Sequence, residues 1–367
     1  MNANHGLIEC RRNICVASQE ETVDVMIRSD RVLKGLPELY QMDRWLEQDD
    51  LPYAVQTLTA VDVGNDCLPV YCFQMGNPNP KAPTLIFTGG VHGVERIGTQ
   101  VLLSFMHTLF ERLDWDDSME DLLRHVRLLF VPLVNPGGML NRRRSNPNGV
   151  DLMRNAPIDA QGNVPFMLGG HRVSRYLPWY RGRRDGPMEN EASAVLKLVE
   201  EVVLQSEFVI SLDCHSGFGH QDQVWFPYAY TPDPFDDIGE MFALRLLFRR
   251  THPNFGFYRI EPQSRNYTTH GDLWDHVYRK TLNRRAGVYL PLTLEMGSWL
   301  WVKKNPLQIF NAMGIFNPVL PHRHERVLRR HQCLMEFLIR AARSFKNWLP
   351  HPADRRDWMH QAIEHWY

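Results

Sequence analysis

Short apolar runs alternate with longer amphipathic stretches from about residue 50 to about residue 315. Four of the runs are short, largely apolar, and closed by polar or glycine-containing sequence, which is typical of strands buried on both faces. They are Thr84–Thr88, Val126–Val134, Phe208–Leu212 and Val288–Leu294. We therefore predict four buried strands at these positions.

Helices are expected between these strands. Apolar residues recur every four positions from Ile97 to Leu109, which predicts a helix from Gly98 to about Glu111 that lies on the sheet. A second apolar stripe predicts a helix from Glu189 to Gln205. Residues from about 320 onward are expected to form a C-terminal helix packed on the domain. This alternation predicts an α/β fold with a single mixed, twisted β-sheet, helices on both faces and a helical C-terminal extension.

Three parts of the chain differ in pattern. Residues 1–50 are an N-terminal lead-in of helical and irregular sequence, residues 51–315 carry the α/β alternation, and residues 316–367 form the helical extension. The chain has 367 residues, of which 44% are hydrophobic and 23% are charged, so it can bury a full hydrophobic core.

Charge and cysteine content narrow the class of protein. The formal net charge is -1, so no global field attracts the chain to nucleic acid or to an anionic membrane. No run approaches the roughly 18–20 apolar residues of a membrane span, and the first residues are too polar for a signal peptide. The six cysteines are expected to be free thiols, as in a reducing compartment. We therefore expect a cytoplasmic protein; its oligomeric state stays open.

Chemically reactive residues follow the predicted strands. His92 and Glu95 follow the first strand, an Asn-Pro-Gly-Gly segment from Asn135 follows the second, His215 follows the third, and Glu295 ends the fourth. Side chains beyond the carboxyl ends of strands converge at one edge of an open α/β sheet. These residues are therefore expected to lie close together although they are far apart in the sequence.

Two histidines and one carboxylate suit a catalytic zinc ion. His92 and Glu95 are three residues apart and can reach one ion if the segment turns helically, and His215 can supply the third ligand. This ligand set leaves one zinc position open, and zinc lowers the pKa of water to about 7. Glu295 is the best candidate for the general base. Taken singly, each residue has a structural alternative: a chance His-x-x-Glu pair, a core histidine or a salt-bridged glutamate.

The chain resembles the zinc carboxypeptidase family over about residues 65–300. Five motifs lie in the family's order: the His92–Glu95 pair, the Asn135–Gly138 segment, the segment from Gly149 to Asn155, His215 with the serine after it, and Glu295. The resemblance extends to the branch that includes aspartoacylase and succinylglutamate desuccinylase, because the first motif is similar in both. It implies that residues 51–315 form a zinc carboxypeptidase-like catalytic domain.

The resemblance also implies roles for individual residues. His92, Glu95 and His215 would bind one zinc ion per chain, with Glu295 as general base and acid. Arg144 matches the arginine that polarises the scissile carbonyl, with Arg142 and Arg143 as alternatives, and Arg154 matches the arginine that holds the substrate's terminal carboxylate. Asp151 would orient a zinc-bound histidine, most plausibly His92. Tyr267 is the candidate for the substrate-capping tyrosine, although it could equally be an ordinary loop aromatic.

One departure from the family pattern concerns carboxylate recognition. The family usually has asparagine immediately before the carboxylate-binding arginine, and Met153 stands there instead. Methionine cannot donate an amide hydrogen bond, so carboxylate recognition should be weaker or differently built.

Three functions remain at this point. The first is a zinc metallopeptidase of the carboxypeptidase type, a hydrolase that cleaves an amide bond next to a free carboxylate in a peptide or small amide. The alternative is a deacylase of small N-acyl amino acids, like aspartoacylase or succinylglutamate desuccinylase. A non-catalytic binding module that keeps the fold is disfavoured, because all three ligands and Glu295 are present.

Two arginine clusters, at 142–144 and 181–184, would bind nucleic acid only if they formed one basic face. Otherwise these arginines line a substrate crevice or are exposed to solvent.

Overall fold

The computed structural model describes residues 28–48, 52–162, 164–311 and 313–367. Most of the N-terminal lead-in, residues 1–27 and 49–50, lies outside the described residues, and so do Cys10 and Cys15. The other four cysteines, Cys67, Cys72, Cys214 and Cys333, are free thiols. Within the described part of the chain, none of the helices combines the length and the apolar character needed to cross a membrane.

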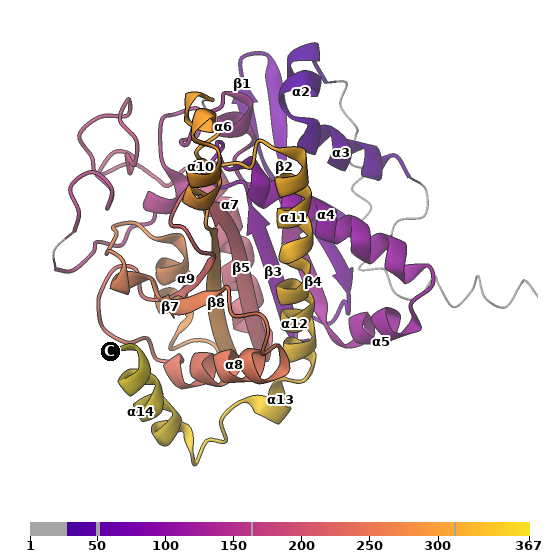
Figure 1. Cartoon of the computed structure of the whole chain (residues 1–367), viewed down its shortest axis with the longest axis vertical. Coiled ribbons are helices and arrows are strands. Elements are labelled where there is room, and N and C mark those ends of the chain that lie inside the picture. Colours follow the sequence, from indigo (N-terminus) through magenta and orange to yellow (C-terminus); the bar gives the residue numbers. More distant parts are fainter. Residues whose placement is uncertain (1–27, 49–51, 163, 312) are drawn as a thin grey trace, which may run out of the picture.

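A single mixed sheet of eight strands forms the centre of the described molecule (Figure 1). The strands are β1 (Ala54–Val63), β2 (Asp66–Gly76), β3 (Thr84–Gly89), β4 (Arg127–Val131), β5 (Phe208–Ser216), β6 (Gln223–Phe226), β7 (Arg259–Pro262) and β8 (Val288–Met296). Their order across the sheet is β1-β2-β4-β3-β5-β8-β6-β7. The predicted α/β fold with one mixed sheet is therefore confirmed.

The four predicted strands are the four central ones. β4, β3, β5 and β8 run parallel to one another, whereas β2 and β6 join them in antiparallel fashion. Almost every residue of β3, β5 and β8 is buried, as the uninterrupted apolar runs predicted. Because these strands are parallel, their carboxyl ends lie at the same edge of the sheet, where the predicted reactive residues follow them.

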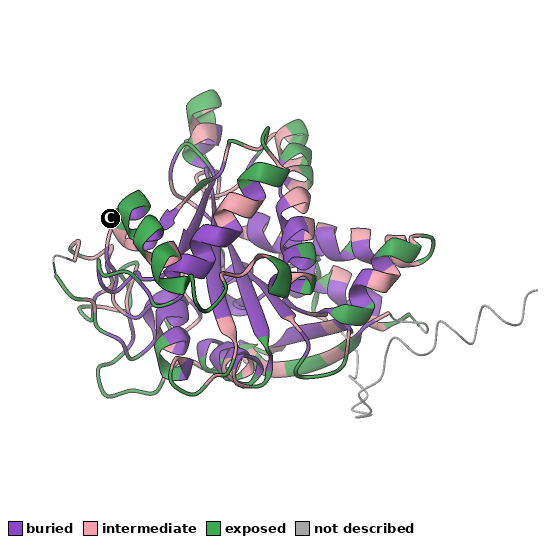
Figure 2. Cartoon of the chain, turned by 90° about the horizontal axis from the view of Figure 1, so that it is seen from below, coloured by how far each residue is buried: buried purple, intermediate pink, exposed green. Residues whose placement is uncertain are grey.

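Helices cover both faces of the sheet (Figures 1 and 2). The helices α4 (Arg96–Leu113), α5 (Asp117–His125), α11 (Pro321–Arg330) and α12 (Gln332–Arg343) pack on one face, whereas α7 (Asn190–Gln205) and α9 (Leu273–Thr281) pack on the other. The remaining helices are α2 (Asp30–Gly35), α3 (Pro37–Leu46), α6 (Pro136–Leu140), α8 (Ile238–Thr251), α10 (Trp299–Lys304), α13 (Phe345–Trp348), α14 (Arg355–Trp366) and the 3-10 turns η1 (Leu152–Arg154), η2 (Gln263–Arg265) and η3 (Pro306–Phe310).

The C-terminal region corrects one prediction in detail. It was expected to contain one helix from about residue 320, but it contains α11, α12, α13 and α14 in succession. A single residue, His331, separates the first two helices, and its backbone stays near helical geometry. Its Nδ1 contacts the Tyr258 hydroxyl at 2.8 Å, so a tertiary contact accompanies the break. The side chains of these helices belong to the same hydrophobic core as the sheet.

Close packing between α4 and the sheet depends on Gly98. A Cβ atom at this position would lie only 2.2 Å from the carbonyl oxygen of Cys214 on β5. This contact fixes the first turn of α4 against β5, the strand that carries His215, and α4 begins directly after Glu95. The glycine therefore lets two segments that carry predicted ligands approach each other.

We expect Gly98→Ala to lower the free energy of unfolding by about 1–3 kcal/mol, because the added methyl group overlaps backbone that cannot rotate away. Gly256→Ala is the matched control, because a Cβ atom at Gly256 has no neighbour within 4 Å. Urea unfolding of the two variants checks the prediction. Equal unfolding midpoints for the two variants would show that α4 can shift away from β5 without a loss of stability.

Candidate metal centre

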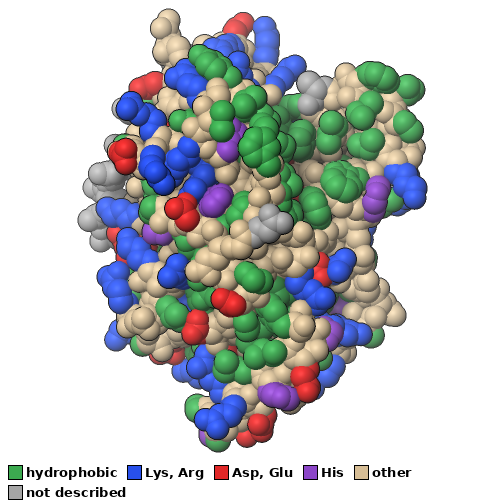
Figure 3. All heavy atoms as spheres, turned by 90° about the vertical axis from the view of Figure 1, so that its left-hand side faces the viewer, with side chains coloured by type: hydrophobic (Ala, Val, Ile, Leu, Met, Phe, Trp, Pro, Cys, Tyr) green, Lys and Arg blue, Asp and Glu red, His purple; other side chains and the backbone are tan. Residues whose placement is uncertain are grey.

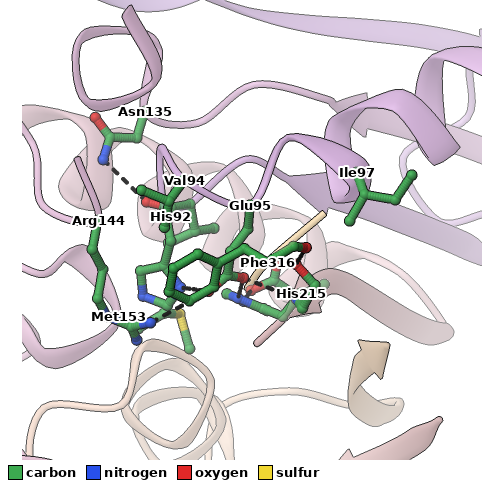
Figure 4. Close-up of polar contacts among 12 residues, drawn as sticks. His92, Val94, Glu95, Ile97, Asn135, Arg144, Met153, His215 and Phe316 are labelled. Carbon is green, nitrogen blue, oxygen red and sulfur yellow. Dashed lines mark hydrogen bonds and ion pairs between the residues drawn. The ribbon is translucent and has the colours of Figure 1, made fainter. Parts of the chain in front are cut away.

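The loop after β3 carries His92 and Glu95, and neighbouring loops hold it in place. The Glu95 backbone N–H donates to the carbonyl oxygen of His92, which closes a tight turn before α4. Asn135 donates through Nδ2 to the Val91 carbonyl and accepts the Gly138 N–H through Oδ1. The segment after β4 is therefore a structural brace for the loop that bears the first two predicted ligands (Figure 4).

His92, Glu95 and His215 converge at the carboxyl edge of the sheet (Figure 4). One donor atom from each residue lies within 4.8 Å of the other two. The Nδ1 atoms of His92 and His215 lie 3.0 Å and 3.1 Å from the two oxygens of Glu95. All three side chains are buried. The structure therefore brings together the three residues that the sequence predicted as metal ligands.

Each imidazole has a second carboxylate behind it. His92 Nε2 lies 3.0 Å from Asp151 Oδ1, and His215 Nε2 lies 2.6 Å from Asp213 Oδ2. Such a carboxylate fixes which ring nitrogen faces the metal and makes that nitrogen a better donor. Both Nδ1 atoms are thus presented toward the same point. The placement of Asp151 against His92 agrees with the role that the resemblance implied.

The charges in the cluster favour a cation. Burial opposes ionisation of Glu95, but the two histidines outweigh it and hold the pKa of this carboxyl below its usual range. Burial also disfavours a charged His215, but Asp213 and Glu95 outweigh it and raise the pKa of His215 well above its usual value. The metal-free cluster therefore binds a proton on His215, and a metal ion would displace it.

The cluster offers two histidine nitrogens and one carboxylate oxygen, it is buried, and a carboxylate lies behind each histidine. This donor set fits the known preferences of zinc. These three residues would hold the ion, and the protein supplies no fourth ligand among its described His, Cys, Asp and Glu side chains.

Arg144 and Glu295 border the cluster. Arg144 donates through Nε to Asp151 Oδ2 at 2.7 Å and through a terminal nitrogen to Glu95 Oε1 at 3.3 Å. Glu295 on β8 is paired in register with His215 on β5. Burial, followed by the negative charge of Glu95, raises the pKa of Glu295 to about 8. A bound cation would favour the ionised form of Glu295 and lower this pKa.

Arg154 and Tyr267 lie together beside the cluster. Burial raises the pKa of the Tyr267 hydroxyl, the nearby Arg154 guanidinium opposes this shift, and the charges of Glu295 and Arg144 act on the same hydroxyl. Arg154 is buried and donates to the backbone carbonyls of Leu168 and Met153, and within the described part of the chain it forms no ion pair. Its positive charge is therefore available to a ligand. Met153 is buried near Arg144 (Figure 4) and offers no hydrogen bond to that ligand.

The two alternatives to Arg144 lie outside the site, and two polar residues close to Tyr267 in the sequence have structural roles. Arg142 and Arg143 are exposed, whereas Arg144 enters the site. Asp272 caps α9 by accepting the backbone N–H groups of Trp274 and Asp275, and His270 accepts the Ala160 N–H.

Sequence reasoning assigned no role to Asp213. Its carboxylate accepts hydrogen bonds from Thr88 Oγ1 on β3 and from Trp274 Nε1 on α9, in addition to its contact with His215. The one signal in the sequence is spacing: residues two apart in a strand share a face, so Asp213 and His215 had to point the same way. The two donors, Thr88 and Trp274, come from distant segments, so the sequence does not indicate that they contact Asp213.

A second set of contacts comes from beyond β8. Asn317 accepts the Ile97 N–H and donates to the Val94 carbonyl, and the Phe316 carbonyl accepts from Ser216 Oγ. Asn317 therefore stabilises the chain on both sides of Glu95, and Phe316, which lies beside His215 in Figure 4, holds the end of β5. No motif marks them in the sequence.

Comparison with known proteins agrees with this geometry. Residues 64–298 match the family described as zinc carboxypeptidase. Carboxypeptidase SOL1 of Arabidopsis thaliana is 24% identical over 251 residues, which cover 65% of this chain and 45% of that protein. The crystal structure of thrombin activatable fibrinolysis inhibitor shares the fold, with a TM-score of 0.60 at 17% identity over 88% of this chain and 79% of that one.

A further relative bears on catalysis. The inactive metallocarboxypeptidase ECM14 of Saccharomyces cerevisiae is 25% identical over 162 residues, which cover 42% of this chain and 36% of that protein. The chain thus spans less than half the length of either curated relative. Membership of the family therefore does not by itself establish activity. The matches do not favour the deacylase alternative, since they are to carboxypeptidases.

We expect Asp213→Asn to weaken zinc binding by about 10- to 100-fold, because the neutral amide no longer strengthens His215 as a donor. The measurement is a zinc Kd from competition with a chromophoric chelator. Asp357→Asn, an exposed position on α14, is the control. An unchanged Kd in a folded variant would contradict a role for Asp213 in metal binding.

Proposed function

Because the chain belongs to the zinc carboxypeptidase family, we propose that it is a zinc-dependent carboxypeptidase that removes the C-terminal residue of a peptide. One observation carries the proposal: the three predicted ligands, Glu295 and a buried arginine with a free charge occupy one edge of the sheet. This chain has both the predicted ligand set and the candidate base, which supports an active enzyme.

His92, Glu95 and His215 would hold the ion. Bound zinc would polarise the substrate carbonyl and lower the pKa of the attacking water. The attack of water on the carbonyl carbon requires a group that accepts its proton, and Glu295, whose ionised form a bound cation would favour, is that acceptor. Glu295 afterwards delivers this proton to the nitrogen of the departing residue as the C–N bond breaks, which balances the hydrolysis.

Arg144 stabilises the negative charge that develops on the carbonyl oxygen. Its guanidinium is held by Asp151 and Glu95, so it is oriented before the substrate arrives. In a buried site such an oriented cation is more effective than one in water, because little reorganisation is needed during the reaction.

Arg154 and Tyr267 receive the end of the substrate. A guanidinium matches a planar carboxylate with two parallel hydrogen bonds, and the Tyr267 hydroxyl lies near enough to the Arg154 guanidinium for the two groups to interact. With Met153 beside it, the arginine has no neighbouring amide donor from that position. Recognition of the terminal carboxylate therefore depends mainly on Arg154.

We expect Glu295→Gln to lower kcat by at least about 100-fold, because glutamine cannot accept or return the proton. Metal analysis should still find one zinc per chain, since Glu295 is not among the ligands. Glu201→Gln, at an exposed position on α7, should behave like the unmodified protein. Unchanged turnover in Glu295→Gln would refute the assigned base.

We expect Arg154→Gln to raise KM for a peptide with a free C-terminus by about 10- to 100-fold, because a charged hydrogen-bonding partner is lost. Arg154→Lys should be intermediate, since it keeps the charge without the fork. The unmodified protein should prefer the free peptide to its amidated form, and this preference should shrink in both variants. Faster cleavage of an N-acyl amino acid than of any peptide would instead identify a deacylase.

A further inference from the structure

The loops beside the proposed site have a composition unlike the rest of the chain. Residues 141–150 and 164–186 together contain eight arginines and a single acidic residue, Asp185, which is a net charge of +7. The whole chain has a net charge of -1. The two segments therefore carry a strong local excess of positive charge.

Only two of these arginines have an acidic partner among the described residues. Arg144 pairs with Asp151 and Glu95, and Arg181 is buried and pairs with Asp159. The others are exposed. We call four of them the arginine rim: Arg142, Arg143, Arg172 and Arg175. None of the four forms an ion pair among the described residues; Arg172 donates to the Gly182 carbonyl at 2.8 Å. Exposed cations that lie close together repel one another.

The rim is attached to the walls of the proposed site. The segment from His171 to Arg181 doubles back on itself, with a bridge between His171 and Tyr180. At its base the Tyr180 carbonyl accepts the Asp151 N–H, and Arg181 Nε donates to the Arg154 carbonyl. Arg142 and Arg143 directly precede Arg144. The exposed arginines are thus joined by short backbone segments to residues that border the metal centre.

Exposed apolar side chains accompany the rim. Phe166, Val173 and Tyr176 are each more than 70% exposed, and the Arg175 guanidinium lies 5.5 Å from the centre of the Tyr176 ring. Figure 3 shows the face that carries these loops, on the left of Figure 1, with basic side chains gathered in its upper part next to hydrophobic ones. Such a surface suits a flexible chain that presents negative charges and some apolar groups.

We propose that the arginine rim binds acidic residues upstream of the scissile bond, so that the substrates are polypeptides with an acidic C-terminal segment. The inference depends on the proposed carboxypeptidase function. An extended peptide advances about 3.3 Å per residue, so residues two to five positions before the cleaved bond leave the site and cross its margin. Arginine binds carboxylates there, and the attraction raises the local substrate concentration.

The test compares three peptides with the same last two residues. Their upstream segments contain four glutamates, four serines or four lysines. At low ionic strength we expect kcat/KM for the acidic peptide to exceed that for the serine peptide by about tenfold, with most of the difference in KM. The ratio should approach one at about 0.5 M salt, where exposed charges are screened within a few ångströms.

A rim variant should remove this preference. Neither Arg143 nor Arg175 has a hydrogen-bonding or acidic side-chain partner among the described residues, so Arg143→Glu/Arg175→Glu should fold normally. We expect it to bring the acidic-to-serine ratio to about one or below. Arg356→Glu on α14, also at an exposed position, should keep the ratio of the unmodified protein.

The outcomes separate the two proposals. If the serine peptide is cleaved as fast as the acidic one, the rim proposal fails while the carboxypeptidase function stands. If no peptide is cleaved by the zinc-loaded protein, the proposed function fails. A single-stranded oligonucleotide that binds more tightly than the acidic peptide in fluorescence anisotropy would overturn the assignment and make the rim a nucleic-acid surface.

Discussion

The Glu95 carboxylate, buried between two imidazoles, is the constraint on which the rest of the site depends. A buried carboxylate is tolerated only when hydrogen-bond donors or positive charge surround it. Here one oxygen faces His92 and Arg144, and the other faces His215 and the Ser216 N–H. These partners come from three segments of the chain, the loop after β3, the loop that carries Arg144 and the end of β5, so the carboxylate is satisfied only when these segments have assembled.

The two carboxylates behind the histidines, Asp151 and Asp213, are also buried, but their negative charges are offset by different partners. Asp151 faces the Arg144 guanidinium, so its negative charge is neutralised by a cation. Asp213 is fully buried and is met by two neutral donors, Thr88 and Trp274, besides His215. More of its negative charge is therefore felt by the imidazole. We infer that His215 is the more strongly polarised of the two histidine ligands.

The sequence predicted the centre of the fold better than its margins, for a physical reason. Strands buried on both faces must be apolar throughout, so β3, β5 and β8 stand out as uninterrupted runs. The edge strand β1 is largely exposed, and β6 and β7 have only four residues each, so none of them produces such a run. A helix break at a single residue, such as His331, leaves no mark in the apolar pattern.

The same limit applies to the site. Ligands that follow buried strands were predictable, because polar residues there need a purpose. Among three consecutive arginines, hydrophobic pattern alone could not tell which one turns inward, and the spacing of the resemblance selected Arg144. The structure adds a reason: Arg142 has a positive φ of 53°, so the chain reverses locally before Arg144. The residue type gives no sign of this turn, because arginine rarely adopts a positive φ.

The first turn of α9 connects the metal centre to the part of the site that would hold the substrate. Trp274 in this turn donates to Asp213, which orients His215. Immediately before the helix, Gly271 packs on the backbone of Arg154, where a Cβ atom would lie 1.9 Å from the carbonyl oxygen. Because Asp272 caps the same turn, a shift of the helix would move both contacts together. The position of the metal ligand and the position of the carboxylate-binding arginine are therefore set by one rigid element, so the distance between them does not depend on a flexible loop.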